Sequence, residues 1–242
     1  MKSHFIVISF FLLAIGILVG GAKALQLHQQ ITLASAEISS TNELLSEAYV
    51  EQNILPQDGL FKEGETSYTF NNVTKAAPVD TLRTIAYKAP SNLAVLGAST
   101  EPRKIVIDLE HQRVYAYEGS RVALNFLVST GKYGATPVGK YKIWYKVRSQ
   151  TMKGGNRALG TYYYLPNVQF IQYFNQGIGF HSTYWHNNYG TPMSHGCVNM
   201  TLTDAETLYY WANPEMPNGV KIFRPTGTNP GTEVEVVSTW NV

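Results

Sequence analysis

Hydrophobic and polar residues alternate along residues 103–224 with the two-residue period of β-strands. Turn signals separate the short apolar runs, and the tightest of these signals is Glu118-Gly119-Ser120. The runs that we expect to form strands are 105–107, 114–117, 123–128, 140–147, 161–166 and 168–174. Residues 140–147, KYKIWYKV, alternate cleanly enough to predict a single strand with two distinct faces. Many short strands with few helices predict a mainly β fold, either a sandwich or a barrel.

One helix is well marked in the same region, after the chain's only cysteine. The sequence TDAE at 203–206 matches a capping box, and the helical pattern that follows ends at Asn213-Pro214. Residues 219–223 have the composition of a closing strand. We expect 225–242 to be a C-terminal tail, with a possible short strand at 233–238.

The N-terminus carries an uninterrupted apolar segment, FIVISFFLLAIGILV, at residues 5–19. Lys2 precedes this run, and AKA at 22–24 is a pattern suited to signal peptidase. The length of the run fits both a long signal peptide and a short membrane span. Residues 1–24 are therefore predicted to be a signal peptide or a signal anchor that contacts the membrane through residues 5–22. Either form implies export to the cell wall or the periplasmic space.

Residues 25–100 show turn signals without a sustained period, and we expect a spacer or stalk there. Apolar positions in its first half suggest a short helix at 41–52. The expected organisation is then the targeting segment 1–24, the spacer 25–100, a catalytic domain at 103–224 and the tail 225–242.

Charge and cysteine content restrict the possible functions. The 242 residues carry 19 Lys and Arg against 17 Asp and Glu, so the formal charge of +2 gives no basic surface for nucleic acid. A single cysteine cannot form an internal disulfide. The thiol of Cys197 is therefore an inert buried group, an intermolecular link or a reactive nucleophile. The sequence does not indicate an oligomeric state.

The segment FHSTYWHNNYGTPMSHGCVNM at 180–200 contains Cys197 and three of the six histidines. An imidazole can accept the proton of a thiol and stabilise the resulting thiolate. His195 lies two residues from Cys197, while His181 lies on a separate apolar run that we expect to form a neighbouring strand. Gly196 permits the sharp turn that backbone N–H groups need to converge on an oxyanion. The residues alone leave both histidines open as the base.

A metal site is the main alternative interpretation of this cluster. His181, His186, His195 and Cys197 are ligand types that suit zinc. Their spacing does not follow the usual paired-ligand patterns, so we expect neither a metal nor a cofactor.

The same residues resemble the L,D-transpeptidase catalytic domain, the YkuD-type family. The family signature has an upstream His, here His181, and then the hexapeptide SHGCVN at 194–199. The segment ATPVGKYKI at 135–143 is similar to the family's T-P-x-G strand entry. The resemblance covers residues 103–224. It implies a mixed β-sandwich with one marked helix after the cysteine motif, preceded by the apolar segment and the spacer.

The resemblance also implies roles for the catalytic residues. Cys197 would be the nucleophile and His181 its base, so the family selects between the two histidines. The backbone carbonyl of Ser182 would hold the imidazole of His181 in the useful tautomer. His195, Gly196 and the Cys197 amide would line the oxyanion site.

Other residues are expected to bind substrate. Lys153 and Arg157 lie in a glycine-containing loop, where they could meet carboxylates, although an ordinary solvated loop is the alternative. Tyr184 and Trp185 are expected to form an aromatic wall or to pack in the interior. Ser194 and Asn199 complete the set, because they flank the His-Gly-Cys core of the motif.

The implied substrate is a peptidoglycan stem peptide. Cys197 would attack the carbonyl of the third residue and expel D-alanine, and an amine of another stem would accept the acyl group. The resulting cross-link between third residues would serve cell-wall organisation and cell shape. The alternatives are an L,D-carboxypeptidase, another exported Cys-His acyl enzyme such as a sortase or peptidase, and a non-catalytic wall- or metal-binding module.

Overall fold

The computed structural model describes residues 25–26, 28–30, 32–33, 59–77 and 101–239, and the chain divides into the units Met1–Glu51 and Gln52–Val242. The predicted targeting segment at 1–24 and the predicted helix at 41–52 lie outside the described residues. In the first unit, the described residues between 25 and 33 are helical. Among the helices that the structure describes, none has the length and apolar content needed to cross a bilayer.

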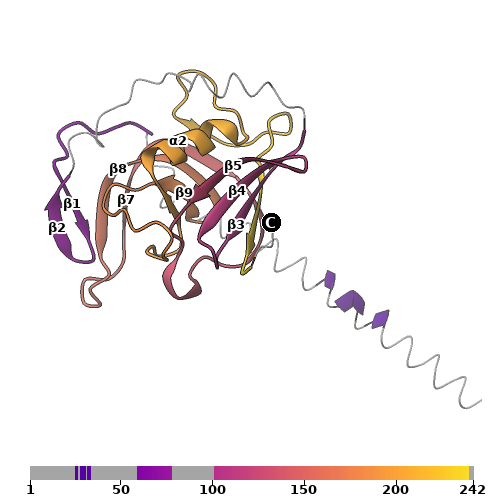
Figure 1. The fold of residues 1–242 in the computed structure, drawn as a ribbon, viewed down its shortest axis with the longest axis horizontal. Coiled ribbons are helices and arrows are strands. Elements are labelled where there is room, and N and C mark those ends of the chain that lie inside the picture. The colour runs from indigo at the N-terminus through magenta and orange to yellow at the C-terminus, as the bar shows by residue number, and fades with distance from the viewer. Residues whose placement is uncertain (1–24, 27, 31, 34–58, 78–100, 240–242) are drawn as a thin grey trace, which may run out of the picture. The chain divides into compact units, whose positions relative to one another are not determined.

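The second unit consists mainly of two β-sheets with helix α2 between them, which confirms the predicted mainly β class (Figure 1). The seven-stranded sheet A has the order β10-β9-β8-β1-β2, with β7 paired to β8 and β11 paired to β7. The five-stranded sheet B has the order β5-β4-β3-β12-β6. The elements are β1 Ser67–Phe70, β2 Val73–Ala76, β3 Arg103–Asp108, β4 Arg113–Glu118, β5 Arg121–Leu127, η1 Lys132–Gly134, β6 Gly139–Lys142, β7 Tyr145–Gly154, β8 Tyr163–Asn175, β9 Ile178–Ser182, β10 Val198–Met200, α2 Leu202–Trp211, β11 Ile222–Phe223 and β12 Glu233–Val237.

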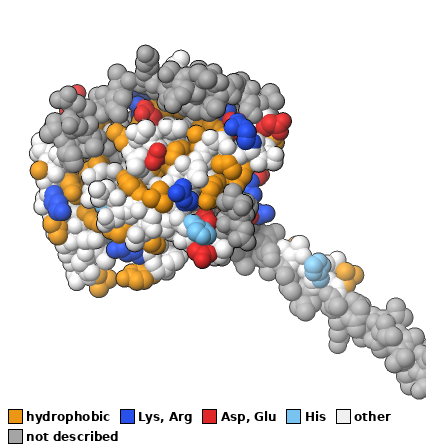
Figure 2. Space-filling model, in the orientation of Figure 1, with side chains coloured by type: hydrophobic (Ala, Val, Ile, Leu, Met, Phe, Trp, Pro, Cys, Tyr) orange, Lys and Arg blue, Asp and Glu red, His pale blue; other side chains and the backbone are white. Residues whose placement is uncertain are grey.

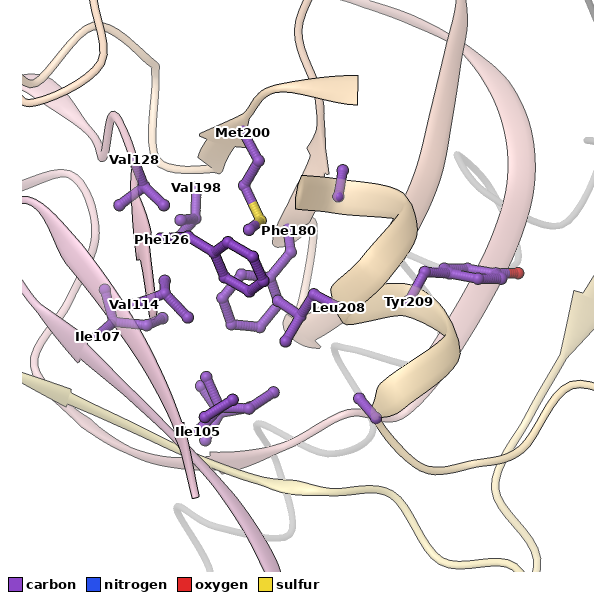
Figure 3. Close-up of a cluster of buried hydrophobic side chains, with 14 of the residues drawn as sticks. Ile105, Ile107, Val114, Phe126, Val128, Phe180, Val198, Met200, Leu208 and Tyr209 are labelled. Carbon is purple, nitrogen blue, oxygen red and sulfur yellow. The ribbon is translucent and has the colours of Figure 1, made fainter. Parts of the chain in front are cut away.

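The hydrophobic core lies between sheet B, helix α2 and the β9–β10 pair. Figure 3 shows Ile105, Ile107 and Val114 from sheet B facing Leu208 of α2, with Phe180 next to them. These five side chains are fully buried. Burying aliphatic and aromatic side chains of this size contributes about 2 kcal/mol each. The core therefore fixes β9 and β10 firmly against the rest of the domain.

Helix α2 begins two residues earlier than the capping box at 203–206 predicts. Thr201 is the N-cap, and its side chain accepts a hydrogen bond from the amide of Asp204 at 3.1 Å. The sequence contains Thr at both 201 and 203, so the pattern alone selects the wrong one. The correct cap adds Leu202 and Thr203 to the start of the helix, whose residues Ala205 and Leu208 are buried in the core.

The C-terminus of α2 is held by a buried lysine. Lys146 is fully buried, and its Nζ donates hydrogen bonds to the carbonyl oxygens of Tyr209, Ala212 and Pro214 at 2.5, 2.9 and 2.9 Å. Burial lowers the pKa of Lys146 well below its ordinary value, with the nearby charge of Arg103 adding to the shift and Glu215 opposing it. Three carbonyls nevertheless match the three protons of an ammonium group. Lys146 thus satisfies carbonyls that a helix end leaves without partners.

The predicted single strand at 140–147 is wrong, because the chain changes sheets in its middle. The amide of Ile143 donates to Thr232 at 3.0 Å, whereas the amide of Trp144 donates to Tyr173 of β8 at 2.9 Å. Both Ile143 and Tyr145 are buried, so the alternation of the sequence continues through the crossing. The pattern therefore detects two strands but not the break between them.

The region predicted to be a C-terminal tail contains a central strand. β12 runs parallel to β3 and antiparallel to β6, and it lies between them in sheet B. Val234 and Val236 are buried, while Glu233 is exposed and Glu235 is partly exposed. The folded domain therefore continues past residue 224.

Part of the predicted spacer also belongs to the folded domain. Strands β1 and β2 form an antiparallel hairpin, and Thr69 of β1 pairs with Tyr164 of β8. The side chain of Asn167 fastens the preceding residues, since it accepts from the amide of Lys62 at 2.7 Å and donates to its carbonyl at 2.8 Å. Residues 59–77 are thus an edge of sheet A rather than a free linker.

Candidate active site

Parallel pairing of β9 and β10 brings the cysteine motif beside His181. Val198 lies opposite Phe180, and Asn199 lies opposite His181. Phe180 and Val198 point into the core, so their neighbours His181 and Asn199 point to the other face of sheet A. Cys197 comes directly before β10, and the alternation of side chains places it on the same face as Asn199 and His181.

The sulfur of Cys197 rests against the turn that leads into β9. Sγ donates to the carbonyl oxygen of Gly177 at 3.6 Å. Burial raises the pKa of Cys197 to about 11, and a hydrogen bond with the backbone of Gly179 opposes part of that shift. The side chain is nevertheless partly accessible to solvent. The thiol is therefore protonated at neutral pH and can be reached from the surface.

His181 is oriented by its neighbour in the chain. The Nδ1–H group donates to the carbonyl oxygen of Ser182 at 2.9 Å, because a carbonyl can only accept. This contact is the one that the family resemblance implies for Ser182, and it leaves Nε2 without a proton. Burial lowers the pKa of His181 to about 4; the Ser182 hydrogen bond opposes the shift and His186 adds to it.

These two pKa values favour a neutral resting pair, a thiol beside an unprotonated imidazole. The sequence predicts a thiolate and an imidazolium instead. The difference arises because burial disfavours the charged form of each group. Neither His181 nor His195 is hydrogen-bonded to Sγ in the described part of the chain. The sulfur must turn away from Gly177 before it can transfer its proton.

The Ser194–Cys197 turn is built around the hydroxyl of Ser194. Ser194 Oγ donates to the carbonyl oxygen of Cys197 at 2.5 Å and accepts from the amide of Gly196 at 3.0 Å. Ser194 therefore shapes the turn, in addition to any contact with substrate. The engaged amide of Gly196 differs from the expectation that Gly196 donates to an oxyanion. Within residues 101–239, the amides of His195 and Cys197 have no acceptor, and they are the available donors.

Gly196 is required by the conformation of the turn. Its φ of +146° lies in the region that glycine favours, and an added Cβ would lie 3.1 Å from the carbonyl oxygen of Ala135. Thr136 contacts the same residue from the T-P-x-G segment. Its Oγ1 donates to the carbonyl oxygen of Gly196 at 2.6 Å and accepts from the amide of Gly131 at 2.8 Å. Sequence reasoning assigned Thr136 no role, although its segment was part of the family pattern.

The surroundings of His195 do not favour it as the base. Its ring packs against Tyr163, with the ring centroids 5.1 Å apart, and its side chain is exposed. Burial and the charge of Lys132 lower its pKa. The structure thus places His195 at the side of the site, next to the start of β8.

His186, which the sequence analysis considered only as a candidate zinc ligand, lies in the site. Its Nδ1 accepts from the amide of Asn188 at 3.3 Å, and its Nε2 lies 2.8 Å from the side-chain amide of Asn199. Burial, followed by the charge of Lys132, lowers the pKa of His186 to about 4. Asn199 therefore anchors His186 beside His181, and this contact gives Asn199 a positioning function.

The two aromatic residues differ in their surroundings. The hydroxyl of Tyr184 donates to the carbonyl oxygen of Pro166 at 2.7 Å, so Tyr184 holds the segment to β8. Trp185 lies beside the base, with its ring centroid 5.9 Å from that of His181. Its buried Nε1 has no hydrogen-bond partner among the described residues. Trp185 is thus the aromatic wall of the site, and Tyr184 is its support.

The two predicted cations lie in and beside the loop at 155–162, and both are exposed. The guanidinium of Arg157 sits over the ring of Tyr162, 3.8 Å from its centroid. Across residues 101–239, neither Lys153 nor Arg157 makes a hydrogen bond or ion pair with the cysteine motif. Figure 2 shows Lys and Arg scattered among other side chains on the face it presents, in line with the small net charge.

The described residues contain no group of three or more His, Cys, Asp and Glu side chains that could hold a metal ion. His186 Nε2 meets an amide, and His181 Nδ1 is occupied by the Ser182 carbonyl. The chemistry available to the site is therefore that of a thiol, a neutral imidazole and two backbone amides.

Comparison with known proteins gives one family and several similar folds. Residues 102–236 match the profile of the YkuD family, the L,D-transpeptidase catalytic domain. No match was found among curated proteins. One similar solved structure is an Ldtfm–avibactam carbamoyl enzyme, with 28% identity and a TM-score of 0.44 over 58% of this chain and 50% of that chain. Another is an L,D-transpeptidase of Mycobacterium smegmatis, with 21% identity and a TM-score of 0.45 over 56% of this chain and 58% of that chain. A third is the catalytic domain of the Enterococcus faecium L,D-transpeptidase, with 29% identity and a TM-score of 0.43 over 57% of this chain and 98% of that chain.

This chain thus spans only 50% and 58% of the first two solved chains. The profile, by contrast, covers more than half of the present sequence and includes β3 to α2, the T-P-x-G segment, His181 and the cysteine motif. On this evidence the chain belongs to the L,D-transpeptidase catalytic domain family.

Proposed function

We propose that this protein is a cysteine-dependent L,D-transpeptidase that cross-links peptidoglycan stem peptides between their third residues. The observation that carries the proposal is the parallel register of β9 and β10, which puts Cys197 and His181 on one face of the sheet. The Ser182 contact supports it, because it leaves Nε2 of His181 free to accept a proton.

The acylation step begins when Sγ rotates from Gly177 towards His181. The thiol proton moves to Nε2 while the sulfur forms a bond to the carbonyl carbon of the third residue. In this proposal the amides of His195 and Cys197 donate to the oxyanion, since neither has an acceptor within residues 101–239. The tetrahedral intermediate then loses its C–N bond, and His181 returns the proton to the departing D-alanine amine.

Transfer follows by the same steps in reverse. An amine on another stem peptide attacks the thioester carbonyl, His181 accepts its proton, and the sulfur leaves as the thiol. Water in place of the amine gives L,D-carboxypeptidase activity, which the same residues support. Export through residues 1–24, with possible membrane attachment through 5–22, would place this chemistry at the wall.

Covalent labelling tests the proposal. A carbapenem resembles the acyl donor, and we expect it to add once to the wild-type protein and not to Cys197→Ala by intact mass. Labelling of both proteins, or of neither, contradicts a cysteine acyl-enzyme. Mass analysis of muropeptides after expression then separates cross-linking from carboxypeptidase activity. Stoichiometric zinc in purified protein that forms no carbapenem adduct would instead support a non-catalytic metal-binding module.

A further inference from the structure

The β1–β2 hairpin turns through two asparagines with positive φ. Asn71 and Asn72 have φ values of 50° and 63°, the left-handed conformation that tight hairpin turns require. Both residues are exposed, and β2 is an edge strand. An Asn-Asn turn needs no further explanation if it only reverses the chain. Asn72, however, makes two additional contacts.

Asn72 holds a loop that lies 85 residues further along the sequence. Its amide donates to the carbonyl oxygen of Tyr162 at 3.1 Å, and its side-chain Nδ2 donates to the carbonyl oxygen of Arg157 at 2.7 Å. The two hydrogen bonds thus bind the loop at 155–162 near its start, at Arg157, and at its end, at Tyr162. The loop is also compact within itself, because Asn156 Oδ1 accepts from the amides of Ala158 and Leu159 at 2.8 and 3.3 Å.

The loop at 155–162 directly precedes β8, whose first residue contacts the cysteine motif. Tyr163 follows it, and the Tyr163 ring packs on His195 of the cysteine motif. The loop also carries the exposed groups best suited to a peptide, the guanidinium of Arg157 and the side chain of Leu159, which is 75% exposed. A carboxylate-bearing, partly apolar peptide such as a stem peptide has groups that complement both.

The same hairpin supports the opposite wall. Phe70 lies 6.2 Å from Trp185 between ring centroids, and Tyr68 meets Tyr184 edge to face at 5.4 Å. Trp185 in turn lies beside His181. The hairpin thus contacts the elements that border His181 and His195. It lies outside residues 102–236, the part of the chain that matches the family profile.

We propose that Asn72 is a positioning residue that fixes the 155–162 loop for binding the acyl-donor stem peptide. The hairpin is then a functional addition to the catalytic domain, and not only an edge of its sheet. This inference rests on the proposed transpeptidase function for its substrate, but the hold on the loop is independent of activity.

The chain offers a matched pair of variants. Asn72→Gly keeps the positive φ and the amide contact with Tyr162 but removes the Nδ2 contact with Arg157. Asn71→Gly changes the same turn at a residue that has no hydrogen bond to the loop in the described part of the chain. We expect the KM for a donor stem peptide to rise about fivefold in Asn72→Gly, because one hydrogen bond is lost. The kcat should change less than twofold, and Asn71→Gly should match the wild type.

Amide hydrogen exchange of residues 155–162 provides a readout that does not depend on catalysis. We expect faster exchange there in Asn72→Gly and none of this acceleration in Asn71→Gly. Unchanged exchange in Asn72→Gly overturns the proposal. Faster exchange with an unchanged KM overturns its substrate part. If wild type and both variants form no carbapenem adduct, the transpeptidase assignment fails, while the exchange comparison still decides whether Asn72 holds the loop.

Discussion

The Nδ1–H group of His181 donates to the carbonyl oxygen of Ser182, 2.9 Å away, and this single contact determines which ring nitrogen carries the proton. A carbonyl accepts only, so Nδ1 keeps its proton and Nε2 presents a lone pair. The peptide bond that joins the two residues makes this orientation a local property of β9. Among the described residues, no hydrogen bond orients the ring of His195, which packs on Tyr163.

The two histidines should therefore respond unequally to substitution. We expect His181→Gln to lower the rate constant of carbapenem acylation by about 100-fold or more, the usual contribution of a general base. His195→Gln should lower it by less than about tenfold, since its amide, and not its ring, serves the oxyanion. Stopped-flow absorbance of the β-lactam gives both rates. Equal losses of rate in the two variants would contradict the assignment of His181 as the base.

Acylation should be insensitive to pH near neutrality. Burial holds the pKa of His181 at about 4 and that of Cys197 at about 11, so neither group titrates between pH 6 and 8. Below about pH 5 the imidazole begins to protonate, and the rate should fall as its base form disappears. A fall of about fourfold between pH 7.5 and 6 is what an imidazole with an ordinary pKa of about 6.5 gives, and it would contradict the neutral pair.

Alkylation by iodoacetamide should follow a different course on the same protein. This reagent needs only the thiolate, and the pKa of Cys197 is raised to about 11. The rate should therefore rise about tenfold for each pH unit between 7 and 9. The rate is measured by intact mass, and a plateau in that range would show a thiol that ionises well below its ordinary pKa of about 8.5.

Gly196→Ala should damage both the turn and the chemistry. The substitution forces a side chain into positive φ and against the carbonyl of Ala135, which costs about 1–3 kcal/mol. Displacing the Cys197 amide should also slow acylation by about 100-fold. Gly227→Ala is the matched control, because an added Cβ there meets nothing within 4 Å. Urea unfolding and acylation rates of the two variants provide the comparison.

Lys146→Met should destabilise the fold without a direct effect on the site. The variant leaves three buried carbonyls at the end of α2 without a donor, which we expect to cost about 3 kcal/mol or more. Lys142→Met removes an exposed ion pair with Glu233 and should cost less than about 1 kcal/mol. Similar urea midpoints for the two variants would contradict the capping role of Lys146.

Strand periodicity and the cysteine motif were sufficient to predict the β class, the helix after the motif and the family. They succeeded because alternation and short motifs are local properties of the chain. The change of sheets at Ile143 was missed because buried residues continue to alternate across it. The short strand predicted at 233–238 is present as β12, but its place inside sheet B was missed, because exposed glutamates at the end of a polar stretch resemble a tail.

Within the site, the missed residues act through contacts that are distant in sequence. His186 gains its position from Asn199, and Thr136 contacts Gly196 across 60 residues. The raised pKa of Cys197 could not be predicted from the sequence, because the degree of burial around Sγ depends on the packed fold. The hairpin at 67–76 carries too few apolar residues to predict a partner, and only its pairing with β8 reveals one.

The central place of β12 in sheet B has a consequence for the order of events during biosynthesis. Within the described part of sheet B, β12 pairs with β3 on one side and with β6 on the other, so β6 joins the sheet through β12. Sheet B cannot be complete until residues 233–237 have left the ribosome. Cys197, His181 and the turn at 194–197 are therefore translated before the sheet on the other side of the core is complete. The proposed export would benefit from this delay, because a secretion channel threads chains that have not finished folding.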